Sequence, residues 1–164
     1  MYRIIGIDPA FREKGFAICD LILNEDLNTH TFHTYNKPHA FFIDYSTDYE
    51  YAFLYFAVEN SNLQNLTFRE SKKISVAERL SRNVGANQAV SQMVVDFLQE
   101  YYGKEKVYEF SPREKGKKDT HEDYVKKCLA LKLQPNKRTS QDERDAFKLA
   151  YLTYHKVKLL ERMK

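Results

Sequence analysis

Two apolar, strand-like runs in this chain each end in a carboxylate. The run Ile4–Ile7 leads directly into Asp8, and the run Phe53–Val58 leads directly into Glu59. A charge at the end of a buried strand is costly unless something compensates for it. Taken singly, each acid has an ordinary explanation, because Asp8 precedes a proline and Glu59 opens a polar segment. Taken together, they indicate two neighbouring strands that each end in an acid, so that both acids lie at one site.

Two more acids, Asp142 and Asp145, lie three residues apart at the start of a predicted helix. This spacing puts both on one helix face near the N-terminus, where simple capping would also account for them. Four carboxylates brought together would repel one another and raise each other's pKa unless a cation neutralised them. The set therefore predicts bound divalent metal, which is the usual apparatus for cutting or transferring phosphates.

The hydrophobic patterns predict the fold around these acids. Strand-like segments separated by turn signals occupy residues 2–8, 15–23, 30–35, 52–58 and 107–110. Apolar residues at helical spacing predict a long helix over residues 76–101, with further helices starting near Thr120 and at the capping box that Ser140 opens. We therefore predict an α/β fold with a mixed five-stranded sheet flanked by helices.

Three details of this prediction bear on function. Gly85 lies in the middle of the long helix, where glycine costs about 1 kcal/mol relative to alanine, so we expect close packing there. Residues 60–74 are polar and aperiodic, which predicts a loop. Residues 113–118 are predicted as a second loop that is strongly basic, with the cations Arg113, Lys115, Lys117 and Lys118.

Charge is distributed unevenly along the 164 residues. Residues 1–68 carry 4 Lys/Arg and 9 Asp/Glu, whereas residues 69–164 carry 22 and 14, so a net charge of +3 divides into −5 and +8. A basic half favours a polyanionic partner, with nucleic acid the first candidate. A solvated lysine-rich surface explains the same asymmetry equally well.

Other classes of protein fit poorly. The sequence has no apolar run long enough to span a membrane and no basic-then-apolar leader, so we expect a cytoplasmic protein that uses no membrane. Cys19 and Cys128 have no metal-ligand partner at short spacing, so we interpret them as reduced core residues. The histidines lack ligand spacing, and neither a phosphate-binding P-loop nor a full dinucleotide fingerprint is present.

The ordered motifs resemble those of the RuvC-type Holliday junction resolvases, in the RNase H-like superfamily. Residues 5–10 and 15–18 resemble that family's Gly-Ile-Asp-Pro-Gly strand and turn, followed by its Gly-aromatic second strand. The resemblance continues colinearly through residues 57–59, 83–86, 118–129 and 142–146, the last being Asp-x-x-Asp-Ala. Ala10 stands where the family has glycine, and residues 24–52 match no bacterial pattern, which is typical of a divergent relative such as a phage-borne one.

The resemblance implies one RNase H-like nuclease domain over residues 1–164, acting as a homodimer that nicks four-way DNA junctions symmetrically. It implies two Mg²⁺ ions per active site, with Mn²⁺ able to substitute, held by Asp8, Glu59, Asp142 and Asp145. Lys118 is the implied catalytic lysine at the scissile phosphate, and Lys115 or Lys117 would share that contact. The long helix around Gly85 is the candidate dimer interface.

The predicted DNA-binding residues form two groups. One is the basic loop, with Arg113, Lys115, Lys117 and Lys118. The other follows Glu59 and comprises Phe68, Arg69, Lys72 and Lys73; Phe68 would either stack on an unpaired junction base or pack on the helix start. Two alternative functions remain open: an RNase H-like nuclease for other branched DNA or RNA–DNA hybrid, and a module that binds branched DNA without cutting it. The intact acids argue against the second.

Overall fold

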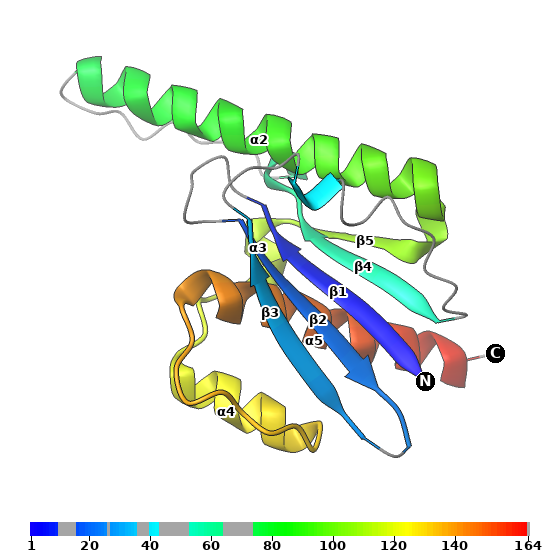
Figure 1. The fold of residues 1–164 in the computed structure, drawn as a ribbon. Coiled ribbons are helices and arrows are strands. Elements are labelled where there is room, and N and C mark those ends of the chain that lie inside the picture. Colours follow the sequence, from blue (N-terminus) through cyan, green and yellow to red (C-terminus); the bar gives the residue numbers. More distant parts are fainter. Residues whose placement is uncertain (10–15, 26, 36–39, 43–52, 64–73, 164) are drawn as a thin grey trace.

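A five-stranded mixed sheet forms the centre of the computed structural model, which describes residues 1–9, 16–25, 27–35, 40–42, 53–63 and 74–163, with side chains from 84 in the last range. Its strands are β1 (Tyr2–Asp8), β2 (Ala17–Leu23), β3 (Thr29–Thr34), β4 (Leu54–Glu59) and β5 (Val107–Phe110), in the order β3-β2-β1-β4-β5. The first three form an antiparallel meander, and β4 and β5 run parallel to β1 (Figure 1). The predicted mixed sheet flanked by helices is confirmed.

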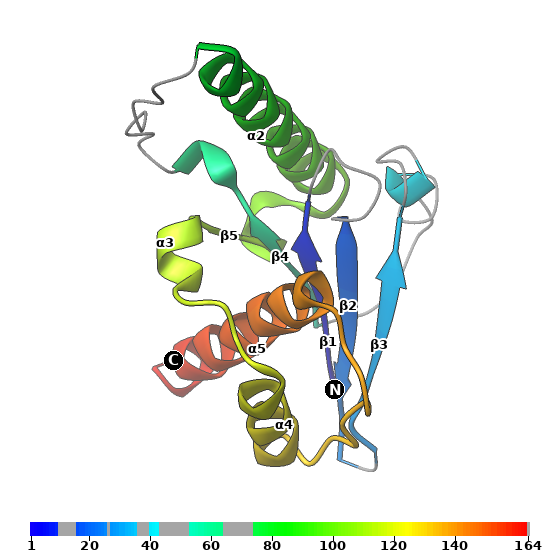
Figure 2. The same ribbon diagram turned by 90° about the vertical axis from the view of Figure 1, so that its left-hand side faces the viewer.

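Helices cover both faces of the sheet (Figures 1 and 2). The long helix α2 (Ile74–Tyr102) packs on one face, while α5 (Gln141–Arg162) crosses β1, β2 and β4 on the other with α4 (His121–Ala130) beside it. Two 3₁₀ turns, η1 (Ser61–Leu63) and η2 (Lys104–Lys106), flank α2 in the chain. No helix in the described residues has the length and apolar character needed to cross a membrane.

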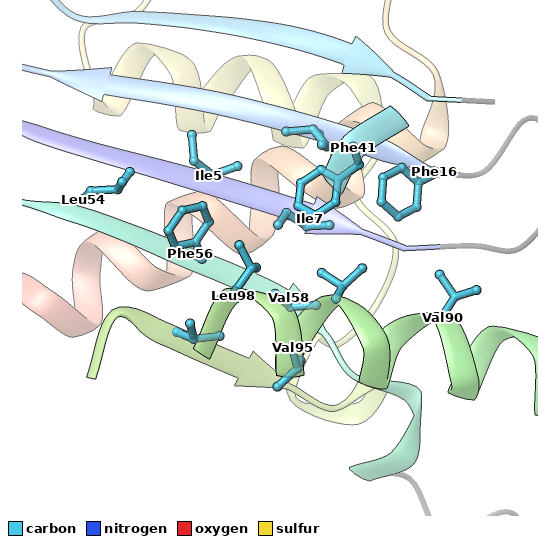
Figure 3. Close-up of a cluster of buried hydrophobic side chains, with 13 residues drawn as sticks. Ile5, Ile7, Phe16, Phe41, Leu54, Phe56, Val58, Val90, Val95 and Leu98 are labelled. Atoms are coloured by element: carbon cyan, nitrogen blue, oxygen red, sulfur yellow. The ribbon is translucent and has the colours of Figure 1, made fainter. Parts of the chain in front are cut away.

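Side chains of β1 alternate between two hydrophobic cores, as the two-residue period of a strand requires. Ile5 and Ile7 point toward α2 and pack with buried residues of β4 and α2, among them Phe56, Val95 and Leu98 (Figure 3). Ile4 points to the opposite face and joins the cluster under α4 and α5. Because β1 is buried on both faces, its sequence is a nearly continuous apolar run and does not alternate between apolar and polar residues.

Close backbone packing at a glycine occurs at Gly6 and not at Gly85, where the sequence analysis expects it. At Gly6, an added Cβ would lie 2.0 Å from the Ala146 carbonyl oxygen and 2.9 Å from the Ala150 nitrogen, so α5 touches the backbone of β1. At Gly85, by contrast, an added Cβ would meet no described atom within 4 Å, and the residue is exposed. The close packing expected around Gly85 is therefore absent within the described part of the chain, and the close contact lies at Gly6 instead.

The predicted basic loop at residues 113–118 begins as a helix, which corrects that part of the sequence prediction. Ser111 caps the short helix α3 (Pro112–Lys115) by accepting a hydrogen bond from the Glu114 amide, and the Glu114 carboxylate accepts one from the Ser111 amide in return. Thr120 and Ser140 form equivalent capping boxes at the starts of α4 and α5. The cap of α3 matters because it fixes the direction of Lys115.

Candidate active site

Asp8 and Glu59 lie at the carboxyl ends of neighbouring parallel strands. In the β1–β4 register Ile7 is paired with Val58, so the next residue on each strand is one of the two acids. Parallel strands end at the same edge of a sheet, and at that edge the two carboxylates interact electrostatically. The structure thus brings together the two acids that the sequence places at strand ends.

Helix α5 supplies the other two acids. Its first turns cross the same edge, where Asp145 is only 2% exposed and Asp142 lies one turn earlier in a more open position. The Gln141 side-chain amide donates a hydrogen bond of 2.8 Å to Asp145 Oδ1, which fixes the orientation of that carboxylate. The contact of α5 with Gly6 sets the depth at which these acids meet the strand ends.

A buried lysine is bound between the acids of the two elements. The Lys115 ammonium forms ion pairs with Glu59 Oε2 and with Asp145 Oδ2, the latter at 3.0 Å, and the residue is only 8% exposed. From the sequence, Lys115 is expected among the DNA-contacting cations, and the family resemblance implies Lys118 as the catalytic lysine. In the structure Lys115 contacts the acids, and Lys118 is exposed, where its charge partly opposes the rise in the pKa of Asp142 that burial and Asp145 cause.

The electrostatics of the cluster reflect crowding of negative charge. Burial raises the pKa of Asp8 to about 8, and the neighbouring carboxylates Glu59, Asp145 and Asp142 push it the same way while Lys115 opposes them. Burial and the Asp145 charge also raise the pKa of Asp142. A carboxyl whose pKa lies near neutrality is a common feature of functional sites.

The same carboxylates keep the Lys115 ammonium charged. Burial alone would lower the pKa of Lys115, but Asp8, Glu59 and Asp145 together raise it above its usual value, so the ammonium stays charged. Lys115 is thus the buried positive charge among these acids, and Lys118 acts on Asp142 from the exposed side. The cluster retains an excess of negative charge that a further cation would relieve.

The donor set of the cluster fits a divalent ion chemically. Carboxylate oxygens are the ligands that Mg²⁺ and Mn²⁺ prefer, and the four acids supply only such oxygens. Among the described residues, however, no three Asp, Glu, His or Cys side chains are placed to hold one metal ion together. The oxygens of Glu59 and Asp145 turn toward the Lys115 ammonium instead.

A second charged network fastens the segment between α3 and α4 to α5. The buried carboxylate of Asp119 forms ion pairs with Lys127 and with Lys148, the latter at 2.8 Å. Lys148 Nζ also donates to the Lys117 carbonyl at 2.5 Å, and Arg144 Nε donates to the Asp119 carbonyl at 3.0 Å. These contacts hold the segment that carries the exposed cations Lys117 and Lys118 beside the acids.

Asn60 stabilises the end of β4 and was not singled out by the sequence analysis. It is only 1% exposed; its amide nitrogen donates to Glu109 Oε2 at 2.7 Å, and its backbone N–H donates to the Phe110 carbonyl at 2.8 Å. These bonds connect the residue after Glu59 to β5. The sequence signal that could have indicated this role is an asparagine directly after a strand-end acid.

The structure describes one of the two predicted groups of DNA-contacting residues, and within that group it separates exposed cations from a buried one. Arg113, Lys117 and Lys118 are exposed on the stretch of chain around Lys115, whereas Lys115 itself is buried in the acidic cluster. The second group, Phe68, Arg69, Lys72 and Lys73, lies outside the described residues.

Comparison with known proteins supports the fold. No protein-family model matches the chain, and no curated protein matches it in sequence. Among solved structures, T. thermophilus RuvC in complex with a Holliday junction substrate is similar, with a TM-score of 0.60 over 96% of each chain at 13% sequence identity. The chain therefore has the RuvC-like, RNase H-like fold. At this identity the similarity shows the fold alone.

Proposed function

We propose that this chain is a metal-dependent endodeoxyribonuclease that resolves four-way DNA junctions by paired, symmetric nicks. The observation that carries the proposal is the meeting of Asp8, Glu59, Asp142 and Asp145 at one edge of a RuvC-like sheet. The solved structure with this fold is a RuvC bound to a Holliday junction, which makes branched DNA the first substrate to test.

The four acids would hold two Mg²⁺ ions, or Mn²⁺ in their place. When bound, such ions activate a water molecule and stabilise the leaving oxygen of a phosphodiester. Asp8 would be one of these ligands; it would bind as the carboxylate, so it would give up the proton that burial otherwise favours. Burial of Asp145 and its bond from Gln141 keep one ligand in place before metal arrives.

Exposed cations beside the cluster would position the DNA. Lys117 and Lys118 lie on the segment that Asp119 and Lys148 fasten to α5, and Arg113 lies just before it, on α3. Their side chains would contact backbone phosphates, and Lys118, whose charge acts on Asp142, would contact a phosphate close to the scissile bond.

A homodimer would match the two-fold symmetry of a four-way junction. Helix α2 is our candidate interface because Gly85 is exposed along it, together with Met93 at 56% and Tyr101 at 60% exposure. Sedimentation of wild type and of Met93→Asp would test this assignment. We expect a dimer that the substitution weakens; a monomeric wild type would contradict it.

Substrate selection is tested by incubating the protein with labelled four-way junction, matched linear duplex, flap DNA and RNA–DNA hybrid, each with Mg²⁺ and with EDTA. We expect cleavage of the junction only, and only with metal. Asp8→Asn should be inactive, while Glu122→Gln, which removes an exposed acid at the start of α4, should cut normally. Equal cutting of linear duplex, or preference for the hybrid, would contradict the proposed substrate.

A further inference from the structure

The feature that the proposed mechanism leaves unexplained is the position of Lys115. Its ammonium reaches Glu59 on β4 and Asp145 on α5 at once, and it is nearly fully buried. Other cations of this segment, Arg113, Lys117 and Lys118, are exposed. The difference has a local cause: Ser111 caps α3, and the helical turn directs the fourth residue, Lys115, inward.

The oxygens that Lys115 engages are the oxygens a metal ion would need. Asp145 Oδ2 accepts the hydrogen bond from Lys115 Nζ, and Glu59 Oε2 forms the second ion pair. An ammonium and a divalent ion on the same oxygens repel each other strongly in a partly desolvated site. The two cations therefore compete for the cluster, and the arrangement around Lys115 explains why the described acids do not already surround one metal position.

Lysine is suited to leave such a position. Its charge is carried on a flexible four-carbon stem, so the ammonium can withdraw by side-chain rotation while α3 keeps its backbone. Gly116, which follows with a φ of 76°, has no Cβ contact within 4 Å among the described residues, so the exit of the helix is uncrowded. The cap of Ser111 and Glu114 would hold α3 itself in place.

We propose that Lys115 is the resident counter-cation of the metal-free site: its ammonium holds Glu59 and Asp145 together until a divalent ion displaces it, and it thereby lowers the affinity for that ion. This inference rests on the metal site of the proposed function. Lys115 acts as a positioning residue that sets a metal threshold, and it keeps an otherwise repulsive cluster folded when metal is scarce.

The direct test is calorimetric titration of the DNA-free full-length protein with Mn²⁺, comparing wild type, Lys115→Met and Lys118→Met. Methionine keeps much of the length of the stem and removes the charge. We expect Lys115→Met to bind the first ion at least about tenfold more tightly, because a competing charge is gone. Lys118→Met, which removes an exposed cation of the same segment, should change the affinity less than Lys115→Met does.

Two outcomes would overturn the inference in distinguishable ways. If Lys115→Met binds Mn²⁺ with wild-type or weaker affinity, Lys115 does not compete, and the metal site of the proposed function stands. If neither wild type nor Lys115→Met binds Mn²⁺, the metal site itself fails, and the proposed function fails with it.

A measurement on wild type decides the matter if Lys115→Met does not fold. A lysine-acylating reagent, read out by peptide mass spectrometry, should leave Lys115 protected in EDTA and modify it once Mg²⁺ is added. Lys126, exposed on α4, should be modified equally in both conditions. Protection of Lys115 that persists at saturating Mg²⁺ would overturn the displacement.

Discussion

Gly6 of β1 and Ala146 of α5 are in direct backbone contact, so that a Cβ on residue 6 would lie 2.0 Å from the Ala146 carbonyl oxygen. Asp145, the neighbour of Ala146, is thereby held at the strand ends where Asp8 lies. A single close approach thus determines how far the acids of α5 reach toward the acids of the sheet. It also gives the first prediction a clear mechanism.

Gly6→Ala should destabilise the fold and weaken the site. The added methyl group would meet helix backbone that no side-chain rotation can move, and overpacking of this kind costs about 1–3 kcal/mol or more. Gly85→Ala is the matched control, because that residue is exposed within a helix and the change should stabilise by up to about 1 kcal/mol. Urea unfolding of both variants measures the difference. Equal stability of the two would show that α5 does not press on β1.

Asp8→Asn should abolish cleavage and leave DNA binding intact. Loss of one carboxylate from a two-metal site should lower the cleavage rate by about 100-fold or more. Binding rests on Lys and Arg contacts to phosphates, which this change does not touch. Single-turnover cleavage and a gel-shift titration with the same junction measure the two effects. Cleavage within a few-fold of wild type would remove Asp8 from the site.

The raised pKa of Asp8 should make the metal-free protein less stable as pH rises. The ordinary carboxyl value is 3.8 and the folded value is about 8, so between these pH values the folded state binds a proton that the unfolded state has lost. Stability contributed by this group is therefore present below about pH 4 and declines up to about pH 8. The measurement is urea unfolding in EDTA from pH 5 to 8.5.

Asp8→Asn is the control for this pH dependence. The variant should lose the decline, and the difference from wild type cancels other groups such as His30, whose pKa burial lowers. Parallel curves for wild type and Asp8→Asn would show that Asp8 is not protonated in the folded protein. Divalent-ion binding should correspondingly strengthen with pH up to about 8, because the ion displaces that proton.

The exposed cations beside the cluster should set the salt dependence of junction binding. Replacing Arg113, Lys117 and Lys118 with alanine should reduce the slope of log K against log salt by about 0.9 for each phosphate that the protein no longer neutralises. Lys126→Ala and Lys137→Ala, which remove exposed cations elsewhere, serve as the control. If the triple variant binds with wild-type affinity and slope, this segment does not contact DNA and is only a solvated connection between helices.

Much of the site was predictable because it depends on strand ends. Apolar runs that end in Asp8 and Glu59 predicted the two strands, and parallel pairing of neighbouring strands then brings the acids together. The capping box at Ser140 likewise fixed the start of α5 and the shared face of Asp142 and Asp145. The strand-end acids and the helix cap can be recognised because each depends on residues that are close together in the sequence.

The inward lysine was not predictable in the same way. Four cations within residues 113–118 look alike in sequence, and only the four-residue helix α3 decides that Lys115 turns inward while Lys118 stays exposed. Gly6 was missed because its neighbour is 140 positions away in the chain, on α5. Both depend on tertiary packing, which a local pattern does not contain.

The most direct test of junction resolution is cleavage of a supercoiled plasmid that extrudes a cruciform. Paired nicks made in one encounter give linear DNA, whereas a single nick releases the supercoiling, reabsorbs the cruciform and leaves a nicked circle. With Mg²⁺ we predict linear product, with ends mapping symmetrically across the cruciform, and none from Asp8→Asn. Nicked circles alone, or linear product with ends scattered around the plasmid, would contradict the proposal that this protein resolves four-way junctions.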